Sequence, residues 1–422
     1  MHPSASRLFP DTVLPAVAFL TLPLAVFAPL MLTWLALLAA LTTIPALLTS
    51  ERTRLRVHPV LVTLAVALLG WAAASSLWST APEHSQQKAV ELVIFTLGGT
   101  ALLLAARGAT PQSRKRTAFA LCTGLAITLA VLVLEISTRG AVQNLLDGVD
   151  GERLSYLSHL NRSASVLAIF VWIPLAFAWD RRSTMVSVGL VVLSFPVLLY
   201  LDPTTPLVAF VFASLVLILA SWRPGAGALL IVAVAILGTA GAPWAESITS
   251  AVSSIASAFA VTDSTILHRF DIWAFAGERI QDRPMIGWGL DASRAVPGGE
   301  ALVERSTEAV INLRATKLPL HPHSATLQLW LELGLPGVLL ATTIVVLGFL
   351  SAARAQAQRF KRAGILAAAT AGFVIAEMSY GIWQGWWLAS LWILAAFAVF
   401  ALTGARPEPD KDSPGVATQI SG

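Results

Sequence analysis

The sequence predicts an all-α integral membrane protein with about twelve transmembrane helices and one long loop between the ninth and the tenth. Of its 422 residues, 56% are hydrophobic and only 12% are charged, and the mean hydropathy is +0.73. A water-soluble fold of this length has no means of hiding so much apolar surface from solvent. The chain also contains repeated apolar runs of about 20 residues, the length that an α-helix needs to cross a bilayer.

The predicted helices follow these apolar runs in order. The first two runs are joined tightly around Pro29, and the longest polar interruption separates the ninth run from the tenth. The twelve runs centre on residues 12–29, 30–49, 59–78, 88–106, 117–137, 162–179, 184–201, 206–221, 227–244, 325–352, 363–382 and 386–403. We expect the single cysteine, Cys122, to pack within the fifth helix, because the chain has no second cysteine to form a disulfide.

The basic residues indicate how these helices are oriented. Short cytoplasmic loops of membrane proteins carry an excess of Lys and Arg, and placing both termini in the cytoplasm gathers most of the short-loop cations on the inner side. These residues are Arg52, Arg54, Arg56, Arg107, Arg114, Lys115, Arg116, Arg181, Arg182, Arg223, Arg354, Arg359, Lys361 and Arg362. We therefore expect a multi-pass protein with both termini cytoplasmic.

This orientation divides the chain into four parts. Residues 1–243 hold the first nine helices, 244–322 form an outer loop, 323–404 hold the last three helices, and 405–422 form a cytoplasmic tail expected to be disordered. The outer loop begins with ESITSAVSSIASAFA, in which apolar residues recur at helical spacing beside serines. This pattern predicts an amphipathic helix that lies along the membrane surface.

Two of the seven histidines stand immediately before the tenth helix, in the sequence HPHSATLQLWLELGLPG. Pro322 restricts His321 to an extended conformation, and Ser324 is placed to cap the helix that follows. Imidazole titrates near neutral pH, so His321 and His323 are suited to proton transfer. The free N–H groups of the helix start also favour an anion. The pattern predicts a reactive site at the outer boundary of the membrane.

Arginines gather in the same outer segments. Arg269, Arg283, Arg294 and Arg314 lie in the long loop, and Arg162 lies at the end of a shorter outer loop. A guanidinium group keeps its charge, and its fork of donors matches the oxygens of a phosphate. Because cations at this boundary need an anionic partner, the outer segments predict an anionic ligand.

The outer motifs together resemble the O-antigen ligase and polymerase family. RFDIWAFAGERIQDRPMIGWGLDASR followed by HPHSATLQLWLELGLPG is similar to the family pattern R-x-x-x-W, RP-x-x-G-x-G and H-x-H-N-x-x-L-Q-x-x-x-E-x-G, and Asn161–Arg162 opens a helix as in the family. Two departures stand out. Ser324 replaces the usual asparagine, and LDPTTPLVAF lacks the Ser-Arg pair that many members carry at the start of the corresponding helix.

The resemblance implies a glycosyltransferase of the bacterial inner membrane with a periplasmic active site. Its donor would be a glycan linked to undecaprenyl diphosphate, and its acceptor would be the lipid A-core of lipopolysaccharide or another glycan. The reaction requires the enzyme to place an acceptor hydroxyl, remove its proton and neutralise charge on the departing diphosphate. No cofactor, metal ion or nucleic acid is expected to take part.

Particular residues are expected to carry these steps. His323 is the candidate general base, and His321 is a second candidate whose favoured role is to support it. Arg269, Arg162 and Arg294 are the candidates for binding the diphosphate. The residues expected to support them are Ser324, Gln328, Glu332, Glu377 and Trp288.

The charged candidates have structural alternatives. Arg269 is also placed to pair with Asp271 or Glu278, and Arg162 to anchor in lipid headgroups. Glu332 would orient His323 or cap a neighbouring segment. A carboxylate within an apolar span needs a partner, and an arginine of the site is one candidate partner for Glu377.

Two further patterns favour a structural interpretation. Trp288 and the tryptophans of YGIWQGWW are interpreted as an interfacial belt rather than as sugar platforms. DGVDG around Asp147 and Asp150 is interpreted as a turn.

Three other functions are alternatives to the ligase reaction. A polymerase, which uses the lipid-linked glycan as donor and acceptor, is the closest alternative. A metal-dependent membrane glycosyltransferase would need carboxylates in its first outer loop, and the sequence near Pro29 has none. A transporter would show inverted repeats or ionisable residues at the bilayer midplane, and neither is evident. The compact RPMIGWGLDASR and HPHSATLQ motifs favour the ligase.

Overall fold

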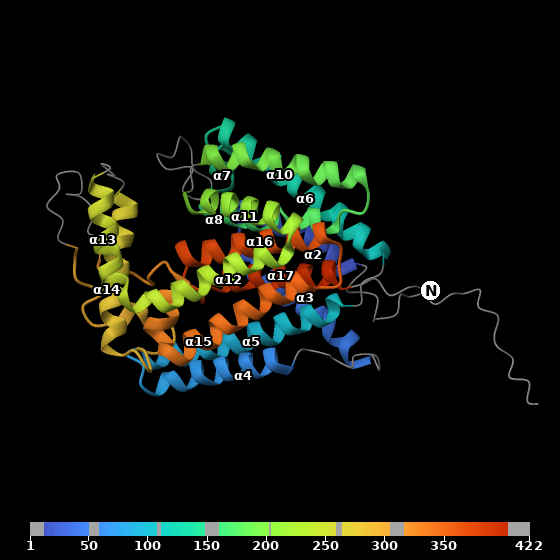
Figure 1. Ribbon diagram of the computed structural model, residues 1–422. Helices are drawn as coiled ribbons and strands as arrows, with labels where there is room; N and C mark the ends of the chain where they lie inside the picture. Colours follow the sequence, from blue (N-terminus) through green and yellow to red (C-terminus); the bar gives the residue numbers. More distant parts are fainter. Residues whose placement is uncertain are drawn as a thin grey trace, which may run out of the picture.

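The computed structural model describes residues 12–49, 59–107, 111–147, 160–201, 204–258, 264–303 and 316–403. Within these residues the secondary structure is helical, apart from one isolated bridge between Leu302 and Thr316. Figure 1 shows long helices running side by side in a bundle, with two further helices, α13 and α14, at one end. The prediction of an all-α membrane fold is confirmed.

The helices of the bundle coincide with the predicted apolar runs. In chain order they are α2 (Leu14–Phe27), α3 (Met31–Thr49), α4 (Pro59–Ala74), α5 (Pro82–Ala106), α6 (Pro111–Ser137), α8 (Asn161–Phe170) continued by α9 (Ile173–Phe177), α10 (Arg181–Leu201), α11 (Thr204–Trp222), α12 (Pro224–Gly241), α15 (Ala325–Arg354), α16 (Arg359–Met378) and α17 (Gly385–Leu402). The elements outside these runs are α7 (Ala141–Asp147), α13 (Ala245–Ala258), α14 (Ser264–Asp282) and three short 3-10 turns, η2 (Ser75–Leu77), η4 (Ala242–Trp244) and η5 (Ser293–Ala295).

Eight helices of the described chain are long and apolar enough to cross a membrane. They include α4 to α6, α10 to α12, α15 and α17. Three further apolar helices, Leu14–Phe27, Met31–Ile44 and Asn161–Phe177, are shorter, and α16 begins with the charged sequence RFKR. The number of twelve spans stays a prediction.

Small residues allow the central helix α16 to pack closely. Its buried face includes Gly364, Ala367, Ala368 and Ala371, and α16 contacts α8, α9 and α11. A Cβ atom added at Gly364 would lie 3.2 Å from the carbonyl oxygen of Trp172. Because the hydrophobic effect does not drive helices together inside a bilayer, close packing of their backbones provides much of the energy of helix association. The predicted core residue Cys122 is half-buried on α6.

The pair α13 and α14 forms a cap over one end of the bundle. The two helices contact each other, and Figure 1 shows them running across the long axis of the bundle. A helix therefore forms where the amphipathic pattern predicts one. Ile248 and Val252 on α13 are 49% and 40% exposed, which leaves apolar side chains available to a membrane surface.

Candidate functional site

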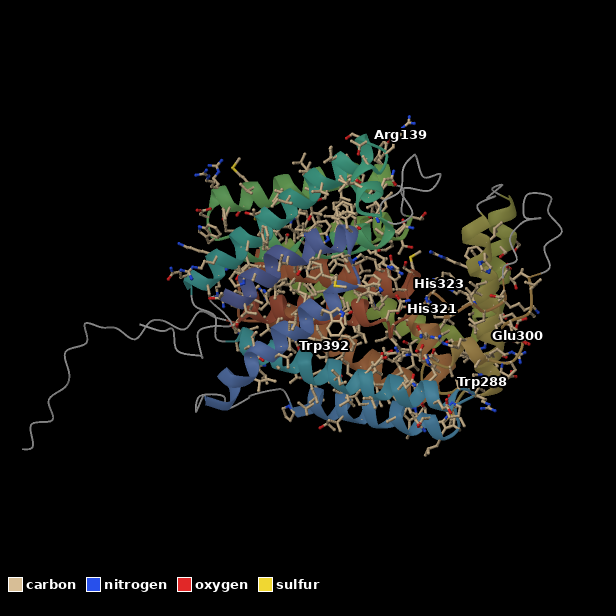
Figure 2. All side chains as sticks on the ribbon, turned by 180° about the vertical axis from the view of Figure 1, so that it is seen from behind. Arg139, Trp288, Glu300, His321, His323 and Trp392 are labelled. Carbon is tan, nitrogen blue, oxygen red and sulfur yellow. The ribbon has the colours of Figure 1, made fainter. Side chains whose placement is uncertain are left out.

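The two predicted histidines lie together at the end of the bundle that faces α13 and α14 (Figure 2). Their ring centroids are 4.3 Å apart. They belong to the segment that leads into α15, and they contact the segment that joins α16 to α17. The indole N–H of Trp273 on α14 donates to the carbonyl of Pro322 at 2.9 Å. The tryptophan of the R-x-x-x-W motif therefore fixes the position of the histidine segment.

The hydrogen bond of His323 determines its tautomer. Its Nδ1 lies 2.5 Å from the carbonyl oxygen of Ser379, and because a carbonyl only accepts, Nδ1 must carry the ring proton. The lone pair is left on Nε2. Burial and electrostatic interaction with Arg269 and His268 lower the pKa of His323, against the opposing effect of the Ser379 bond. The ring is therefore neutral at neutral pH and able to accept a proton at Nε2.

The backbone of His323 is held in an unfavourable conformation. Its φ angle is +54°, a left-handed value that costs a non-glycine residue roughly 1–3 kcal/mol. The backbone N–H of His323 donates to Nδ1 of His321 at 3.2 Å, and Trp273 fixes the adjacent carbonyl. Such strain persists where the surrounding contacts over-determine a geometry, and it concentrates at functional sites.

His321 is buried and engaged on both sides of its ring. Nδ1 lies 3.2 Å from the backbone N of His323, and Nε2 lies 3.2 Å from the backbone N of Gly381; a neutral imidazole has one unprotonated nitrogen and accepts from one of these N–H groups at a time. A Cβ atom at position 381 would come within 2.9 Å of the imidazole, so glycine is required there. Burial, followed by electrostatic interaction with His323 and Arg294, lowers the pKa of His321 to about 3. A neutral ring wedged between two backbone segments suits the supporting role.

Ser324 caps α15 as the sequence predicts. Its Oγ accepts from the N–H of Leu327 and donates to Glu377 at 3.1 Å. Glu377 also accepts from the hydroxyl and the N–H of Thr326 at 2.9 and 3.2 Å. The candidate pairing of Glu377 with an arginine is wrong for the described residues, because its carboxylate is occupied by the first turn of α15. A helix N-terminus supplies donors that serve a carboxylate in place of a cation.

Glu332 connects the segment that contains Asp291 and Ser293 with the segment between α16 and α17 that contains Trp383. Its fully buried carboxylate accepts from the N–H of Asp291 at 2.7 Å, the hydroxyl of Ser293 at 2.5 Å and the indole of Trp383 at 2.6 Å. Gln328 adds a further donor at 3.0 Å and accepts from the N–H of residue 382 at 2.9 Å. Of the two predicted roles, Glu332 therefore caps neighbouring segments and makes no contact with His323.

A break in α15 explains why the motifs RPMIGWG and ELG occur together. Gly334 interrupts the helix with φ 62° and ψ −164°, which frees carbonyl groups from the helical pattern. The N–H groups of Trp288 and Gly289 bind the carbonyls of Leu331 and Glu332, each at 2.9 Å. A Cβ atom at Gly334 would lie 2.6 Å from the Met285 backbone. The segment RPMIGWG thus fits against the kink of ELG.

Arg269 and Arg162 approach the histidines from different helices. Arg269 on α14 donates to the hydroxyl of Thr205 on α11 at 3.2 Å. Arg162, at the start of α8, lies over the ring of Trp386 at 5.9 Å. Both guanidinium groups interact electrostatically with Tyr380, which follows the Ser379 carbonyl that binds His323. The structure therefore brings two predicted diphosphate ligands together next to the candidate base.

Arg294 belongs to a second charged group. It lies 3.7 Å from Asp291, whose carboxylate is also 2.8 Å from His84 and 3.7 Å from Lys88 on α5. The charge of Arg294 acts on His321 rather than on His323. Asp291, like His323, has a positive φ, of 51°. Arg294 therefore interacts with His321, whereas Arg269 interacts with His323.

Comparisons with known proteins agree with this arrangement. A family model described as O-antigen ligase matches residues 189–342, which contain the arginine, glycine and histidine motifs of the site. Over these residues the chain is similar to the O-antigen ligase family.

Similar proteins occur in Rickettsia and are provisionally named polysaccharide ligases. One from Rickettsia conorii is 25% identical over 287 residues, which is 67% of this chain and 66% of the relative. Another, from Rickettsia prowazekii, is 26% identical over 279 residues, or 65% of each chain. A third, from Rickettsia felis, is 31% identical over 140 residues, or 32% of each. The first two matches span slightly less than two thirds of the relatives' length.

The tryptophans of the site correct one prediction. Trp288 is buried, its indole donates to the carbonyl of Arg279 at 2.9 Å, and Arg283 covers its ring at 4.1 Å. Trp383, Trp386 and Trp387 are buried as well. These four rings are buried within the described chain and therefore do not form an exposed interfacial belt.

Some residues of the site were missed, and some predictions fall outside the described chain. Tyr380, Thr205 and the partners of Asp291 are separated from the motifs by long stretches of sequence, and only the cluster PEHSQQK at the start of α5 offered a signal for His84 and Lys88. Within the described residues, no three His, Cys, Asp or Glu side chains are grouped to hold a metal ion. The predictions for Arg52, Arg54, Arg56, Asp150, Arg314, the 405–422 tail and part of the 137–162 loop lie outside the described residues.

Proposed function

We propose that this protein is an O-antigen ligase-like, metal-independent glycosyltransferase that moves a glycan from undecaprenyl diphosphate to the lipid A-core. One observation carries the proposal: the unprotonated Nε2 of His323 is available within a cluster that also contains Arg269 and Arg162. The family match and the names of the Rickettsia relatives support a ligase rather than a polymerase.

In the proposed reaction, His323 removes the proton from an acceptor hydroxyl. The hydroxyl oxygen then attacks the anomeric carbon of the donor sugar, and the bond from that carbon to the diphosphate oxygen breaks. The diphosphate leaves with the bonding electrons, and Arg269 and Arg162 neutralise the charge that develops on it. The proton taken up at Nε2 is later released to water.

The same charges couple donor binding to proton transfer. Without a donor, the positive charge of Arg269 lowers the pKa of His323 and makes the imidazole a weak base. A bound diphosphate would offset that charge, and the imidazolium formed in the reaction would gain an anionic neighbour. His323 thus becomes a stronger base when the donor is in place.

Location at the inner membrane with a periplasmic site is part of the proposal. The histidine segment lies at the end of the bundle away from Arg114, Lys115 and Lys361, which belong to the loops predicted to be cytoplasmic. At this boundary a lipid-linked donor enters sideways from the bilayer while its glycan stays in water. A bulky acceptor approaches beneath α13 and α14.

Deletion of the gene in its bacterial host tests the proposed function. Lipopolysaccharide from the deletion strain should lose its long glycan, and the glycan should accumulate on the lipid carrier. Expression of the wild-type gene should restore the long form, whereas His323→Ala at an equal membrane level should not. Unchanged lipopolysaccharide in the deletion strain would reject the ligase function.

A further inference from the structure

A basic cavity lies at the opposite end of the bundle from the histidines. It has a volume of about 330 Å³ and is bounded by the start of α6, the end of α9, the α15–α16 connection and the end of α17. Arg114, Lys115 and Lys361 supply its charge, while Phe177, Trp179 and Leu402 supply apolar walls. The glycosyltransfer mechanism makes no use of this cavity.

The three cations are close together without neutralising carboxylates. Lys361 is subject to the positive charge of Arg114, and within the described chain no Asp or Glu oxygen lies within ion-pair distance, 4.0 Å, of these three side chains. Asp180 interacts electrostatically with Lys115, but it does not line the cavity, and its carboxylate accepts from the N–H of Ser183 at 2.7 Å. Like charges held together favour an anionic ligand.

The guanidinium of Arg114 is positioned rather than loose. It donates to the carbonyls of Ala401, at 3.1 Å, and Thr403 at the end of α17, and it lies 5.7 Å from the ring centroid of Phe400. Its Nε is buried and has no hydrogen-bond partner within the described residues. A guanidinium that the protein holds in place at a cavity wall, beside two lysines, has the form of a binding site for an oxyanion.

The apolar walls indicate what carries the anion. Trp179 is 47% exposed, as expected for an indole at the level of the lipid headgroups, and Lys115 lies 5.9 Å from its ring centroid. Basic pockets between membrane helices accommodate phospholipid headgroups, with the glycerol and acyl carbons against apolar side chains. We propose that this cavity binds the phosphate of an anionic phospholipid, with Lys115 and Lys361 as its charged ligands beside Arg114.

The test measures thermal unfolding of the purified full-length protein in a neutral detergent. Dioleoyl phosphatidylglycerol is titrated, with dioleoyl phosphatidylcholine and inorganic phosphate as separate arms. Binding to the folded state raises the unfolding temperature. The double variant Lys115→Gln, Lys361→Gln removes two ligands, and Arg181→Gln, Arg182→Gln removes two exposed cations that do not line the cavity. A Lys115→Arg, Lys361→Arg variant restores the charge and controls for folding.

Phosphatidylglycerol should stabilise the wild type saturably, and the Lys→Gln pair should require about 30-fold more of it, roughly fivefold for each lysine. The Arg181, Arg182 variant and the Lys→Arg variant should bind within about threefold of wild type. Equal weakening by both glutamine pairs would reduce the effect to general surface charge and overturn the proposal. Equal stabilisation by phosphatidylcholine, or saturation by inorganic phosphate with no further effect of lipid, would overturn the assignment to an anionic phospholipid.

Discussion

At the scale of single residues, the Ser379 carbonyl determines which nitrogen of His323 is free. Nδ1 carries the proton, so Nε2 is the atom offered to an acceptor hydroxyl. The ring of the neighbouring His321 has different surroundings, because both of its nitrogens face backbone N–H groups. Two histidines one residue apart therefore have separate roles, one suited to chemistry and the other to support.

The pH dependence of transfer tests the electrostatics of His323. Burial and Arg269 lower its pKa below the usual 6.5, so the free enzyme should keep an unprotonated base under mildly acidic conditions. The midpoint for loss of kcat/KM on acidification should lie below pH 6.5. Arg269→Gln removes a positive charge, makes protonation easier and should move that midpoint upward. A wild-type midpoint above pH 6.5, or a downward shift in the variant, would contradict the assignment.

Substitution of the two arginines tests how the donor is held. Arg162→Ala and Arg269→Ala should each reduce transfer by about tenfold or more, because each removes a charge-assisted contact to phosphate. Lysine at either position should restore only part of the rate, since a point charge cannot reproduce the bidentate fork. Initial rates at several donor concentrations measure this. Full recovery by lysine at both sites would favour anchoring of the arginines in lipid headgroups. Loss of transfer on addition of EDTA would show that a divalent ion, rather than the arginines, neutralises the diphosphate.

At the scale of helices, a broken helix creates the frame of the site. The kink of α15 at Gly334 presents carbonyls to the segment Met285–Gly289, and Glu332 on the same turn binds Asp291 and Ser293. The N-terminus of α15 meanwhile holds Glu377 of α16. These bonds fix the position of the arginine and histidine segments relative to each other.

Two glycines on α15 form a matched test of this frame. Gly334→Ala forces a Cβ atom into the Met285 backbone and a positive φ onto alanine, and should lower the free energy of unfolding by about 1–3 kcal/mol. At Gly348, on the same helix, nothing lies within 4 Å of an added Cβ atom, so Gly348→Ala should leave stability unchanged or raise it by up to about 1 kcal/mol. Thermal unfolding in detergent compares them. Equal stability of the two variants would show that the kink is not required.

At the scale of the whole molecule, the helices could be predicted from the sequence because each apolar run is local. The histidine segment could be predicted too, since Pro322 and Ser324 act on adjacent residues. The contact of Arg269 with Thr205 joins residues that are 64 positions apart in the chain, and the contact of His84 with Asp291 joins residues that are 207 positions apart. They depend on packing that no local pattern encodes. The burial of the YGIWQGWW tryptophans was mispredicted for the same reason.

The central claim is that His323 catalyses glycan transfer to a second lipid. The most direct measurement uses purified protein in liposomes with lipid-linked glycan, with and without lipid A-core, and follows the glycan on gels. Wild type should transfer glycan only when lipid A-core is present, and His323→Ala should bind donor normally but transfer about a hundredfold more slowly. A ladder formed from donor alone would identify a polymerase, and near-normal transfer by His323→Ala would contradict the account.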